Sequence, residues 1–592
     1  MKELDYPFDS KYIIKKKKSL KRQLLVADTG YIDKKIAVLG GSTTHDIAAI
    51  LEIFLLNFGI RPQIYECEYN KYWEDVMFDN PELAGFAPDI IYFHTTNRNI
   101  RFPEIGMSED DVKGMLDNDY GKFCAMWEKA GSTYHCPIIQ NNFEFPAYRI
   151  LGNSECVNVA GSVNYVNSLN ERFAGYARCH KDFYIEDIQY LSASYGLDAW
   201  ADPLYWHMYK YALSMEAIPT LAYSVACIIK SIYGKNKKVL TLDLDNTLWG
   251  GVVGDDGADN LAIGQETSMG QVYSEFQEYV RRHKDIGVLL TVDSKNDHEN
   301  AIAGLEHPDS ILHPDDFVVI KANWEPKSRN LADTAAELNL LPESFVFVDD
   351  NPAEREIISA QIPGVAVPDI GEVENYIRSI DHAGYFEVTN LSADDAKRNE
   401  MYKANAQRAA LEATFSDYGQ YLDSLEMTGI VRNFEPVFLD RISQLTNKSN
   451  QFNLTTRRYS RADIEKVSES DEYIDIYGKL IDKFGDNGVV SVVIGHRNKD
   501  VLDIDLWIMS CRVLKRDMEY AMMDELVRQS REAGLSRIIG YYYPTAKNNM
   551  VRDFYAGMGF NKISEDAEGN TTWEYDLTKE YVNKNTHITI SR

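Results

Sequence analysis

The chain has 592 residues, of which 44% are hydrophobic and 26% charged, a composition typical of globular proteins with about three or four domains. Its formal net charge of -29 disfavours nucleic acids and anionic membranes as general partners. Seven scattered cysteines without a C-x-x-C pair fit a reducing, cytoplasmic compartment, and no apolar run approaches the ~18 residues that span a bilayer.

Residues 1–30 carry a basic cluster formed by Lys15, Lys16, Lys17, Lys18, Lys21 and Arg22. Such a cluster fits either a docking site for an acidic partner or a solvated basic arm, and a charge run is more often solvated. We therefore predict a basic N-terminal arm over residues 1–30.

A first α/β domain is predicted over residues 31–234. A strand at 35–39 runs into Gly40, Gly41 and Ser42, and a helix follows at 47–58. Ser42 is either the N-cap of that helix or a nucleophile at the carboxyl end of a parallel strand. Two further strands are predicted at 62–66 and 89–94, the second ending just before Asn97.

The order of the G-G-S-T turn, Asn97 and a late His207 resembles the SGNH (GDSL-like) hydrolase fold, a flavodoxin-like α/β architecture. The resemblance implies that Ser42 and His207 form a catalytic pair and that Asn97 donates to an oxyanion. The sequence departs from the pattern, because Asp202 stands five residues before His207 and G-G-S replaces G-D-S. An N-cap serine and a core histidine explain the same residues equally well.

The central domain, predicted over residues 235–385, alternates strands at 239–243, 288–293 and 345–349 with helices at 269–286 and 328–340. This alternation predicts a doubly wound parallel sheet. Polar residues follow each strand, and a lysine opens the second helix: Asp243 and Asp245, then Ser294 to Asp297, then Lys327, then Asp349 and Asp350. Because parallel strands end at one edge of a sheet, these side chains are expected to meet there.

This set resembles the D-x-D-x-T, Ser, Lys and D-D motifs of the haloacid dehalogenase (HAD) superfamily of Rossmann-like proteins. The resemblance implies that Asp243 is a nucleophile for phosphorus and that Asp245 is the general acid and base. Ser294 and Lys327 would bind phosphoryl oxygens, and Mg²⁺ would lie among Asp243, the Asp245 backbone carbonyl, Asp349 and Asp350. We further predict that three neighbours bind substrate: Thr247, Lys295 and Asn296.

The gaps between these motifs are too short for a folded cap domain. Members of the superfamily without a cap generally admit large or protein-borne substrates, so the resemblance implies an open site of this kind. A linker helix is expected within residues 386–425, in a stretch from 394 to 415 that carries few helix breakers.

The last domain, residues 426–592, resembles the GNAT acyltransferase α+β fold and ends in its F-Y-x-x-x-G-F pattern. The pyrophosphate loop of that fold reads R-x-x-G-x-G/A, but here Lys515 and Asp517 replace the glycines, which argues against CoA binding. Arg512 is a candidate substrate-binding residue. Cys511 is either a nucleophile activated by neighbouring cations or a small buried residue.

Taken together, the motifs L-D-L-D-N-T-L-W-G-G, V-D-S-K-N-D, V-D-D-N-P-x-E-R, N-K-S-N-Q-F-N-L-T-T-R-R and M-S-C-R-V resemble the FkbH-like family over residues 35–577. That family takes 1,3-bisphosphoglycerate and delivers a glyceryl group to an acyl carrier protein. The resemblance implies that Asp243 handles the phosphate and that Cys511 carries the glyceryl group. Three alternatives remain open: a plain phosphomonoesterase with non-catalytic flanking domains, an esterase that uses Ser42 and His207, and a non-enzymatic scaffold.

Overall fold

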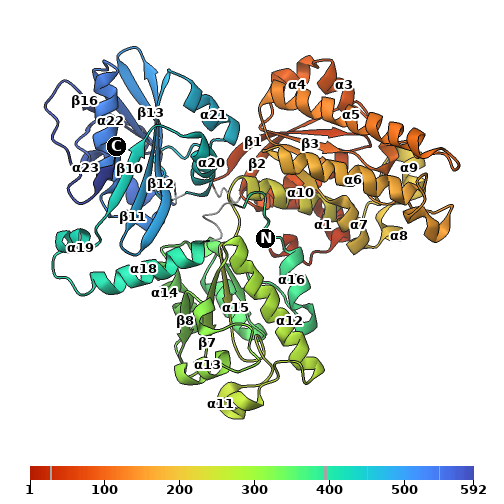
Figure 1. Cartoon of the computed structure of the whole chain (residues 1–592), viewed down its shortest axis with the longest axis horizontal. Helices are drawn as coiled ribbons and strands as arrows, with labels where there is room; N and C mark the ends of the chain where they lie inside the picture. Colours follow the sequence, from red (N-terminus) through yellow and green to blue (C-terminus); the bar gives the residue numbers. More distant parts are fainter. Residues whose placement is uncertain (27–29, 392–396, 450, 546, 592) are drawn as a thin grey trace. The chain divides into compact units, whose positions relative to one another are not determined.

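The computed structural model of the chain describes residues 1–26, 30–391, 397–449, 451–545 and 547–591. The chain divides into two compact units, Met1–Ile232 and Tyr233–Arg592 (Figure 1). None of the helices in these described ranges combines the length and the apolar character that a bilayer crossing requires.

The first unit is built on a five-stranded sheet whose neighbouring strands are all parallel. Its strands are β1 (Ile32–Gly40), β2 (Ile60–Glu66), β3 (Ile90–His94), β4 (Ile138–Asn141) and β5 (Phe183–Glu186). Their order, β2-β1-β3-β4-β5, is that of flavodoxin-like folds. Strand β3 is buried throughout and β1 is buried from Ile36 to Gly40, as expected for strands covered on both faces.

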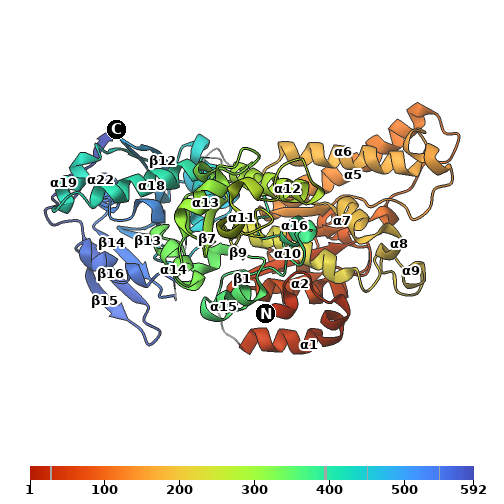
Figure 2. The same ribbon diagram turned by 90° about the horizontal axis from the view of Figure 1, so that it is seen from below.

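Helices cover both faces of this sheet (Figure 2). One face carries α2 (His45–Asn57) and α10 (Ile218–Ile232), which contact each other, and the other carries α5 (Glu109–Tyr134) and α6 (Ser162–Cys179). Shorter helices connect these elements: α3 (Tyr72–Met77), α4 (Pro81–Phe86), α7 (Ile188–Tyr195), α8 (Leu197–Trp200) and α9 (Pro203–Tyr209).

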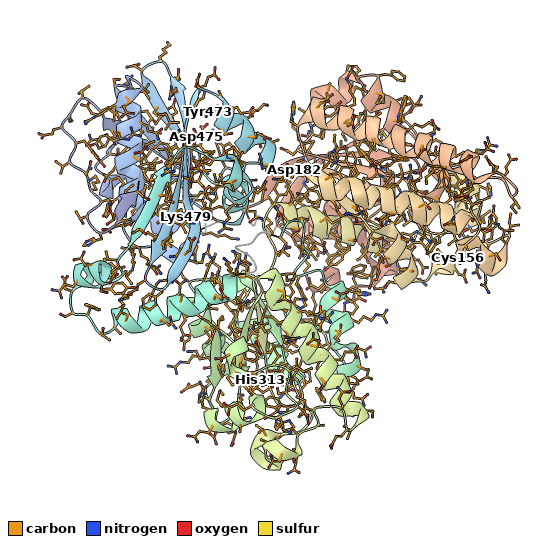
Figure 3. The ribbon with its side chains drawn as sticks, viewed as in Figure 1. Cys156, Asp182, His313, Tyr473, Asp475 and Lys479 are labelled. Atoms are coloured by element: carbon orange, nitrogen blue, oxygen red, sulfur yellow. The ribbon has the colours of Figure 1, made fainter. Side chains whose placement is uncertain are left out.

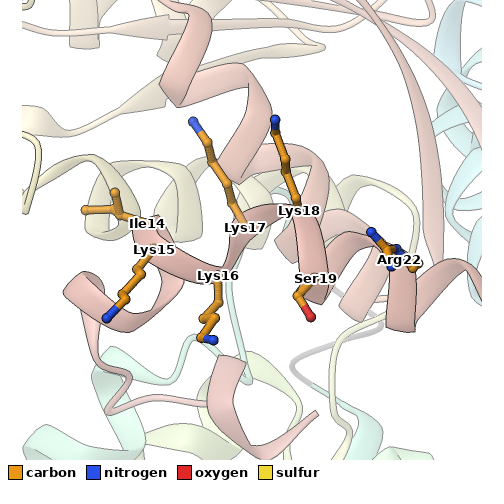
Figure 4. Close-up of a pocket in the computed structure, with 7 residues that line it drawn as sticks. All are labelled: Ile14, Lys15, Lys16, Lys17, Lys18, Ser19 and Arg22. Atoms are coloured by element: carbon orange, nitrogen blue, oxygen red, sulfur yellow. The ribbon is translucent and has the colours of Figure 1, made fainter.

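The predicted basic arm is instead a packed helix, α1 (Ser10–Val26). Its apolar residues at helical spacing, Ile13, Leu20 and Leu24, are buried, and the helix contacts α2 and α10. Lys17 pairs with Asp46 (2.5 Å) and Lys21 with Glu52 (2.7 Å) of α2. The remaining cations line a shallow hollow of about 360 Å³ together with Lys17, Ile14 and Ser19 (Figure 4): Lys15, Lys16, Lys18 and Arg22.

The second unit begins with a parallel four-stranded sheet in the order β8-β7-β6-β9. The strands are β6 (Val239–Leu242), β7 (Leu289–Ser294), β8 (Val319–Ala322) and β9 (Phe345–Val348). Its helices are α11 (Val253–Asp256), α12 (Ser268–Arg282), α13 (His298–Leu305), α14 (Lys327–Glu337), α15 (Pro352–Gln361) and α16 (Tyr376–His382). The edge strand β8 is absent from the sequence prediction because it is short and mostly half-exposed, so it lacks the buried apolar run of its neighbours.

The rest of this unit has an α+β fold around an eight-stranded sheet, ordered β15-β16-β14-β13-β12-β11-β10-β17. The strands are β10 (Thr428–Arg432), β11 (Tyr473–Asp482), β12 (Gly485–Asn498), β13 (Val501–Met509), β14 (Arg537–Tyr542), β15 (Asn561–Glu565), β16 (Thr571–Asp576) and β17 (Thr589–Ser591). All neighbours are antiparallel except β13 with β14 and β10 with β17. The helices are α18 (Arg398–Glu412), α19 (Tyr418–Ser424), α20 (Leu439–Lys448), α21 (Arg461–Glu469), α22 (Met518–Glu532) and α23 (Phe554–Gly557).

One buried ionic network joins α18 to the end of β11. The Arg408 guanidinium donates to both carboxylate oxygens of Asp482 (2.7 and 2.8 Å), and Arg516 donates to the same carboxylate (3.3 Å). All three side chains are buried. At the other side of the same hairpin, Lys479 pairs with Asp486 (2.7 Å) near the surface, and Figure 3 shows Lys479 on the same strand as Tyr473 and Asp475.

We expect Asp482→Ala to destabilise the second unit by about 3–5 kcal/mol, because it leaves two buried guanidinium groups without their counter-charge. Asp486→Ala is the matched control, since it breaks a half-exposed pair worth at most about 1 kcal/mol. Urea unfolding followed by near-ultraviolet circular dichroism measures both. Equal midpoints for the two variants would contradict a stabilising role for this network.

Candidate functional site

Three carboxylates meet at the carboxyl edge of the four-stranded sheet. Asp243 follows β6, and Asp349 and Asp350 follow β9, so that one oxygen from each lies within 4.8 Å of the others. Asp243 and Asp349 are buried. The Lys327 ammonium, from the first turn of α14, lies 2.9 Å from Asp243 Oδ2 and 2.6 Å from Asp349 Oδ2. Local sequence explains the placement, because each side chain stands where a strand ends or a helix begins.

The charges of this cluster shift one another's pKa values. Burial raises the pKa of Asp349, and the neighbouring Asp243 raises it further. Burial alone would lower the pKa of Lys327, but Asp243 and Asp349 outweigh it and keep that pKa well above its ordinary value. The lysine is therefore a permanent cation between two carboxylates.

The donor set fits Mg²⁺. Carboxylate oxygens are the ligands that this hard cation prefers, and three of them converge here. Asp243 Oδ1 is buried, and no hydrogen-bond donor within the described residues reaches it. Such an oxygen is costly in an apolar environment and is well suited to a metal.

Asp245 points its carboxylate away from this cluster. Its Oδ1 accepts hydrogen bonds from Trp249 Nε1 (2.9 Å) and the Val253 amide (3.0 Å), and its Oδ2 accepts from Asn296 Nδ2 (3.0 Å). Burial raises the pKa of Asp245, while the Val253 and Trp249 hydrogen bonds oppose that shift. Three hydrogen bonds thus hold the carboxylate in one orientation outside the cluster of three carboxylates, which suits a proton donor and acceptor.

The other residues predicted from the HAD motifs divide into two groups. Ser294 lies buried at the end of β7, in the same edge as Asp243. Thr247 and Lys295 contact the scaffold: Thr247 Oγ1 accepts from the Asp350 amide (3.1 Å), and Lys295 pairs with Glu354 (2.6 Å). Asn296 orients Asp245 through the bond given above.

Three supporting residues escaped the sequence prediction. Trp249 is fully buried and donates to Asp245. Arg355 donates to the backbone carbonyls of Asp349 (2.7 Å) and Asp350 (2.8 Å). Asn330 donates to Asp293 Oδ1 (3.1 Å) at the end of β7. Arg355 belongs to the V-D-D-N-P-x-E-R run, so its position was visible in the sequence although its role was not.

In the first unit, Ser42 lies at the end of β1, at the point where strand order reverses between β1 and β3. The turn that carries it is joined to the end of α9, because Thr43 donates to the carbonyls of Lys210 and Tyr209. Ser42 Oγ is buried without a hydrogen-bond partner among the described residues, and His207 is exposed on α9. The segments of the expected pair are therefore close, but the serine–histidine hydrogen bond is not formed.

Asp202 and Asn97, the residues expected to assist that pair, make hydrogen bonds to other groups. The Asp202 carboxylate caps α9 through the amides of Leu204 (2.8 Å) and Tyr205 (3.3 Å). Asn97 donates its side-chain amide to the Phe145 carbonyl (3.2 Å). The residue beside the glycine turn is Asn99, whose Nδ2 donates to the Gly41 carbonyl (2.8 Å).

The predicted pyrophosphate loop of the last domain keeps the backbone of the glycine pattern but not its side chains. Lys515 and Asp517 have φ values of 63° and 61°, the left-handed conformation that favours glycine, yet both carry charged side chains, and Asp517 has the wrong sign for pyrophosphate. Arg512 Nε donates to Ser510 Oγ (3.3 Å). The side chain of Cys511 lies outside the described residues.

In the same region, the chain's own segment 452–454 pairs with the edge of β13. β13 pairs with β14 only over Val501–Asp503, beyond which the segment 452–454 bonds to both. The Met509 amide donates to the Phe452 carbonyl (3.1 Å), the Leu454 amide to Trp507 (3.2 Å), and the Tyr543 amide to Leu454 (2.9 Å). An extended ligand therefore cannot pair with this part of β13.

Comparisons with known proteins agree with the geometry. Residues 35–230 match the sequence profile of the family described as FkbH, N-terminal domain. The chain is similar to the N-terminal part of the protein BF1531 from Bacteroides fragilis, which contains a phosphatase domain and is complexed with Mg. The identity is 28%, the TM-score is 0.57, and the match covers 63% of this chain and 98% of the other. The comparison with curated proteins gave no match.

Two acetyltransferases match the chain over 27% of its length, each at 11% identity and a TM-score of 0.21. They are the ribosomal-protein-S18-alanine N-acetyltransferase from Escherichia coli, of which 100% is covered, and yncA from Salmonella typhimurium with acetyl-CoA, of which 99% is covered.

We expect Asp293→Asn to raise the melting temperature in EDTA, with a gain that grows from about pH 4 to pH 8. Burial raises the pKa of Asp293 to about 8, so the folded chain holds a proton that the unfolded chain has lost, and native stability falls as pH rises through this window. The asparagine removes that dependence and keeps an oxygen for Asn330. Differential scanning fluorimetry at pH 5 and pH 8.5 checks the sign, and an equal gain at both values would contradict it.

Proposed function

We propose that the chain is a Mg²⁺-dependent phosphatase that uses Asp243 as its nucleophile. The observation that carries the proposal is the buried meeting of Asp243, Asp349 and Asp350 with the Lys327 ammonium. A dianionic phosphate needs positive charge around it, and the Lys327 ammonium supplies one permanent positive charge among these carboxylates. The similarity to a phosphatase-containing protein complexed with Mg supports the same reading.

In the proposed reaction, the Asp243 carboxylate attacks phosphorus in line, and the bond between phosphorus and the leaving oxygen breaks. Asp245 gives its proton to that oxygen, so the leaving group departs as a neutral alcohol. Asp245, now a carboxylate, removes a proton from water, which attacks the aspartyl phosphate and releases inorganic phosphate and Asp243. The raised pKa of Asp245 fits a group that must hold a proton in the first step.

The surrounding groups bind and orient the phosphoryl oxygens. Lys327 offers a point charge and Ser294 a hydroxyl at the same sheet edge. A magnesium ion bound by Asp243, Asp349, Asp350 and the Asp245 carbonyl would neutralise the charge that otherwise keeps phosphate away from these carboxylates.

The finer proposal couples this chemistry to transfer of a glyceryl group from 1,3-bisphosphoglycerate to an acyl carrier protein. Removing the acyl phosphate by attack on phosphorus would leave a free carboxylate, which cannot form a thioester. We therefore assign the ester phosphate to Asp243 and the acyl group to Cys511. The Cys511 thiolate attacks the acyl carbonyl, a carbon–sulfur bond forms, and the acyl phosphate leaves as inorganic phosphate. The match to the FkbH N-terminal domain supports this pathway class.

We expect Asp243→Asn to lower phosphate release from acetyl phosphate by on the order of 10³-fold or more, because an amide cannot act as the nucleophile. A malachite-green assay with Mg²⁺ and with EDTA measures the loss. Asp255→Asn, at an exposed position of the short helix α11, is the matched control and should keep wild-type turnover. Equal activity of Asp243→Asn and Asp255→Asn would contradict the phosphatase assignment.

We expect intact-mass analysis after incubation with 1,3-bisphosphoglycerate and Mg²⁺ to show a glyceryl adduct that Cys511→Ala abolishes. Cys156→Ala is the control, because Cys156 is an exposed cysteine of the first unit (Figure 3). With Asp243→Asn the adduct should persist but retain one phosphate, since the ester phosphate is no longer removed. An adduct of unchanged yield on Cys511→Ala would refute the covalent step and leave a plain phosphatase.

A further inference from the structure

Trp324 is exposed beside the phosphate site. Of the eight tryptophans, all of which lie in the described part of the chain, it is the one with an exposed side chain, at 69%. Trp249, in the same sheet's first loop, is fully buried. Within the described residues no aromatic ring or cation packs on the Trp324 indole. A single exposed apolar ring is common on protein surfaces, so the case for a role rests on how this ring is held and where its loop lies.

The exposed ring is nevertheless held in position. Its Nε1 donates to Asp297 Oδ1 at 2.8 Å. Asp297 is the N-cap residue of α13, where an aspartate ordinarily accepts a backbone amide, but it makes no side-chain capping bond. The carboxylate is used on the tryptophan instead of on its own helix, so the ring position is maintained at the expense of a capping contact.

The loop that carries Trp324 belongs to the catalytic edge. It follows β8, and its Asn323 amide donates to the Ser294 carbonyl (3.2 Å). Trp324 stands three residues before Lys327, so their Cα atoms lie within about 11 Å of each other. Asp297 likewise stands three residues after Ser294. The indole is therefore anchored between the two loops that deliver the phosphate-binding hydroxyl and ammonium.

We propose that Trp324 is a binding subsite for the organic group attached to the transferred phosphate. This inference rests on the proposed phosphatase function and names its substrate class: phosphate esters whose organic group is uncharged next to the phosphate and presents C–H bonds or an aromatic face. The indole face is electron-rich and packs on such groups, whereas it and the Asp297 carboxylate disfavour a second anion. The chain has no room for a folded cap domain between its catalytic motifs, so this fixed ring supplies the contact that a lid would otherwise make.

The subsite also agrees with the order of steps proposed above. Once the acyl phosphate has left, the remaining phosphoester is attached to an uncharged glyceryl thioester. That group satisfies the charge requirement of the Trp324 surface, while the doubly phosphorylated starting compound does not.

The test is the selectivity between acetyl phosphate, phenyl phosphate and 1-naphthyl phosphate, measured as kcat/KM with Mg²⁺. We expect Trp324→Ala to lower the ratio for naphthyl over acetyl phosphate by about tenfold, mainly through KM, since a stacked aromatic pair contributes up to about that factor. Trp324→Phe should keep most of the ratio. Asp297→Asn, which still offers an oxygen to the indole N–H, should keep it, and Asp297→Ala should lose part of it.

Tyr148→Ala, which removes an aromatic ring that is 71% exposed in the first unit, is the control and should leave the ratio unchanged. Trp324→Gln provides a second variant at the same exposed position if Trp324→Ala folds poorly. A naphthyl-to-acetyl ratio equal to wild type in these variants overturns the subsite. Failure of the phosphatase proposal looks different, because Asp243→Asn would then hydrolyse all three compounds as fast as the wild type.

Discussion

The structure of the catalytic region depends on one constraint: three carboxylates must be held within a few ångströms of one another at the edge of a buried sheet. Coulomb repulsion and burial both oppose this arrangement, and the raised pKa of Asp349 expresses the cost. Lys327 offsets it with ion pairs to Asp243 and Asp349. Because the lysine opens a helix that packs on the same sheet, the counter-charge is as firmly placed as the charges that it balances.

The neighbouring polar groups serve the same requirement. Arg355 fixes the backbone of Asp349 and Asp350, and Thr247 accepts the amide of Asp350. Asp245 is kept out of the cluster by Trp249 and Asn296, which gives the second acid of the motif a separate environment. Two carboxylates separated by one residue thereby lie in different environments, which suits the separate nucleophile and proton-donor roles that we propose for Asp243 and Asp245.

In the acyl transfer that we propose, the structural basis differs from that of CoA-dependent enzymes. The glycine positions of the expected pyrophosphate loop keep the left-handed backbone but carry Lys515 and Asp517. The edge of β13 is occupied by the chain's own segment 452–454. These features led us to propose that the thioester forms on the protein itself, at Cys511. In the first unit, Ser42 Oγ lies at the strand switch point without a hydrogen-bond partner among the described residues.

The amino-acid sequence by itself determined which polar residues meet at the edge of the four-stranded sheet. Asp243, Ser294 and Asp349 end predicted strands, and Lys327 begins a predicted helix. Their meeting was predictable because parallel strands end at the same edge of a sheet. The sequence also contained the replaced glycines at 515 and 517. Only the tertiary structure decided which residues support that edge. Thr247 and Lys295 make contacts within the scaffold, α1 proved to be a packed helix and not an arm, and Ser42 Oγ has no hydrogen-bond partner among the described residues. These contacts join residues that are distant in the sequence. Their geometry depends on tertiary packing, so no local sequence pattern predicts them. Trp324 is a further example. The sequence shows a tryptophan at this position, but only the folded structure shows that its ring is exposed and that it donates a hydrogen bond to Asp297.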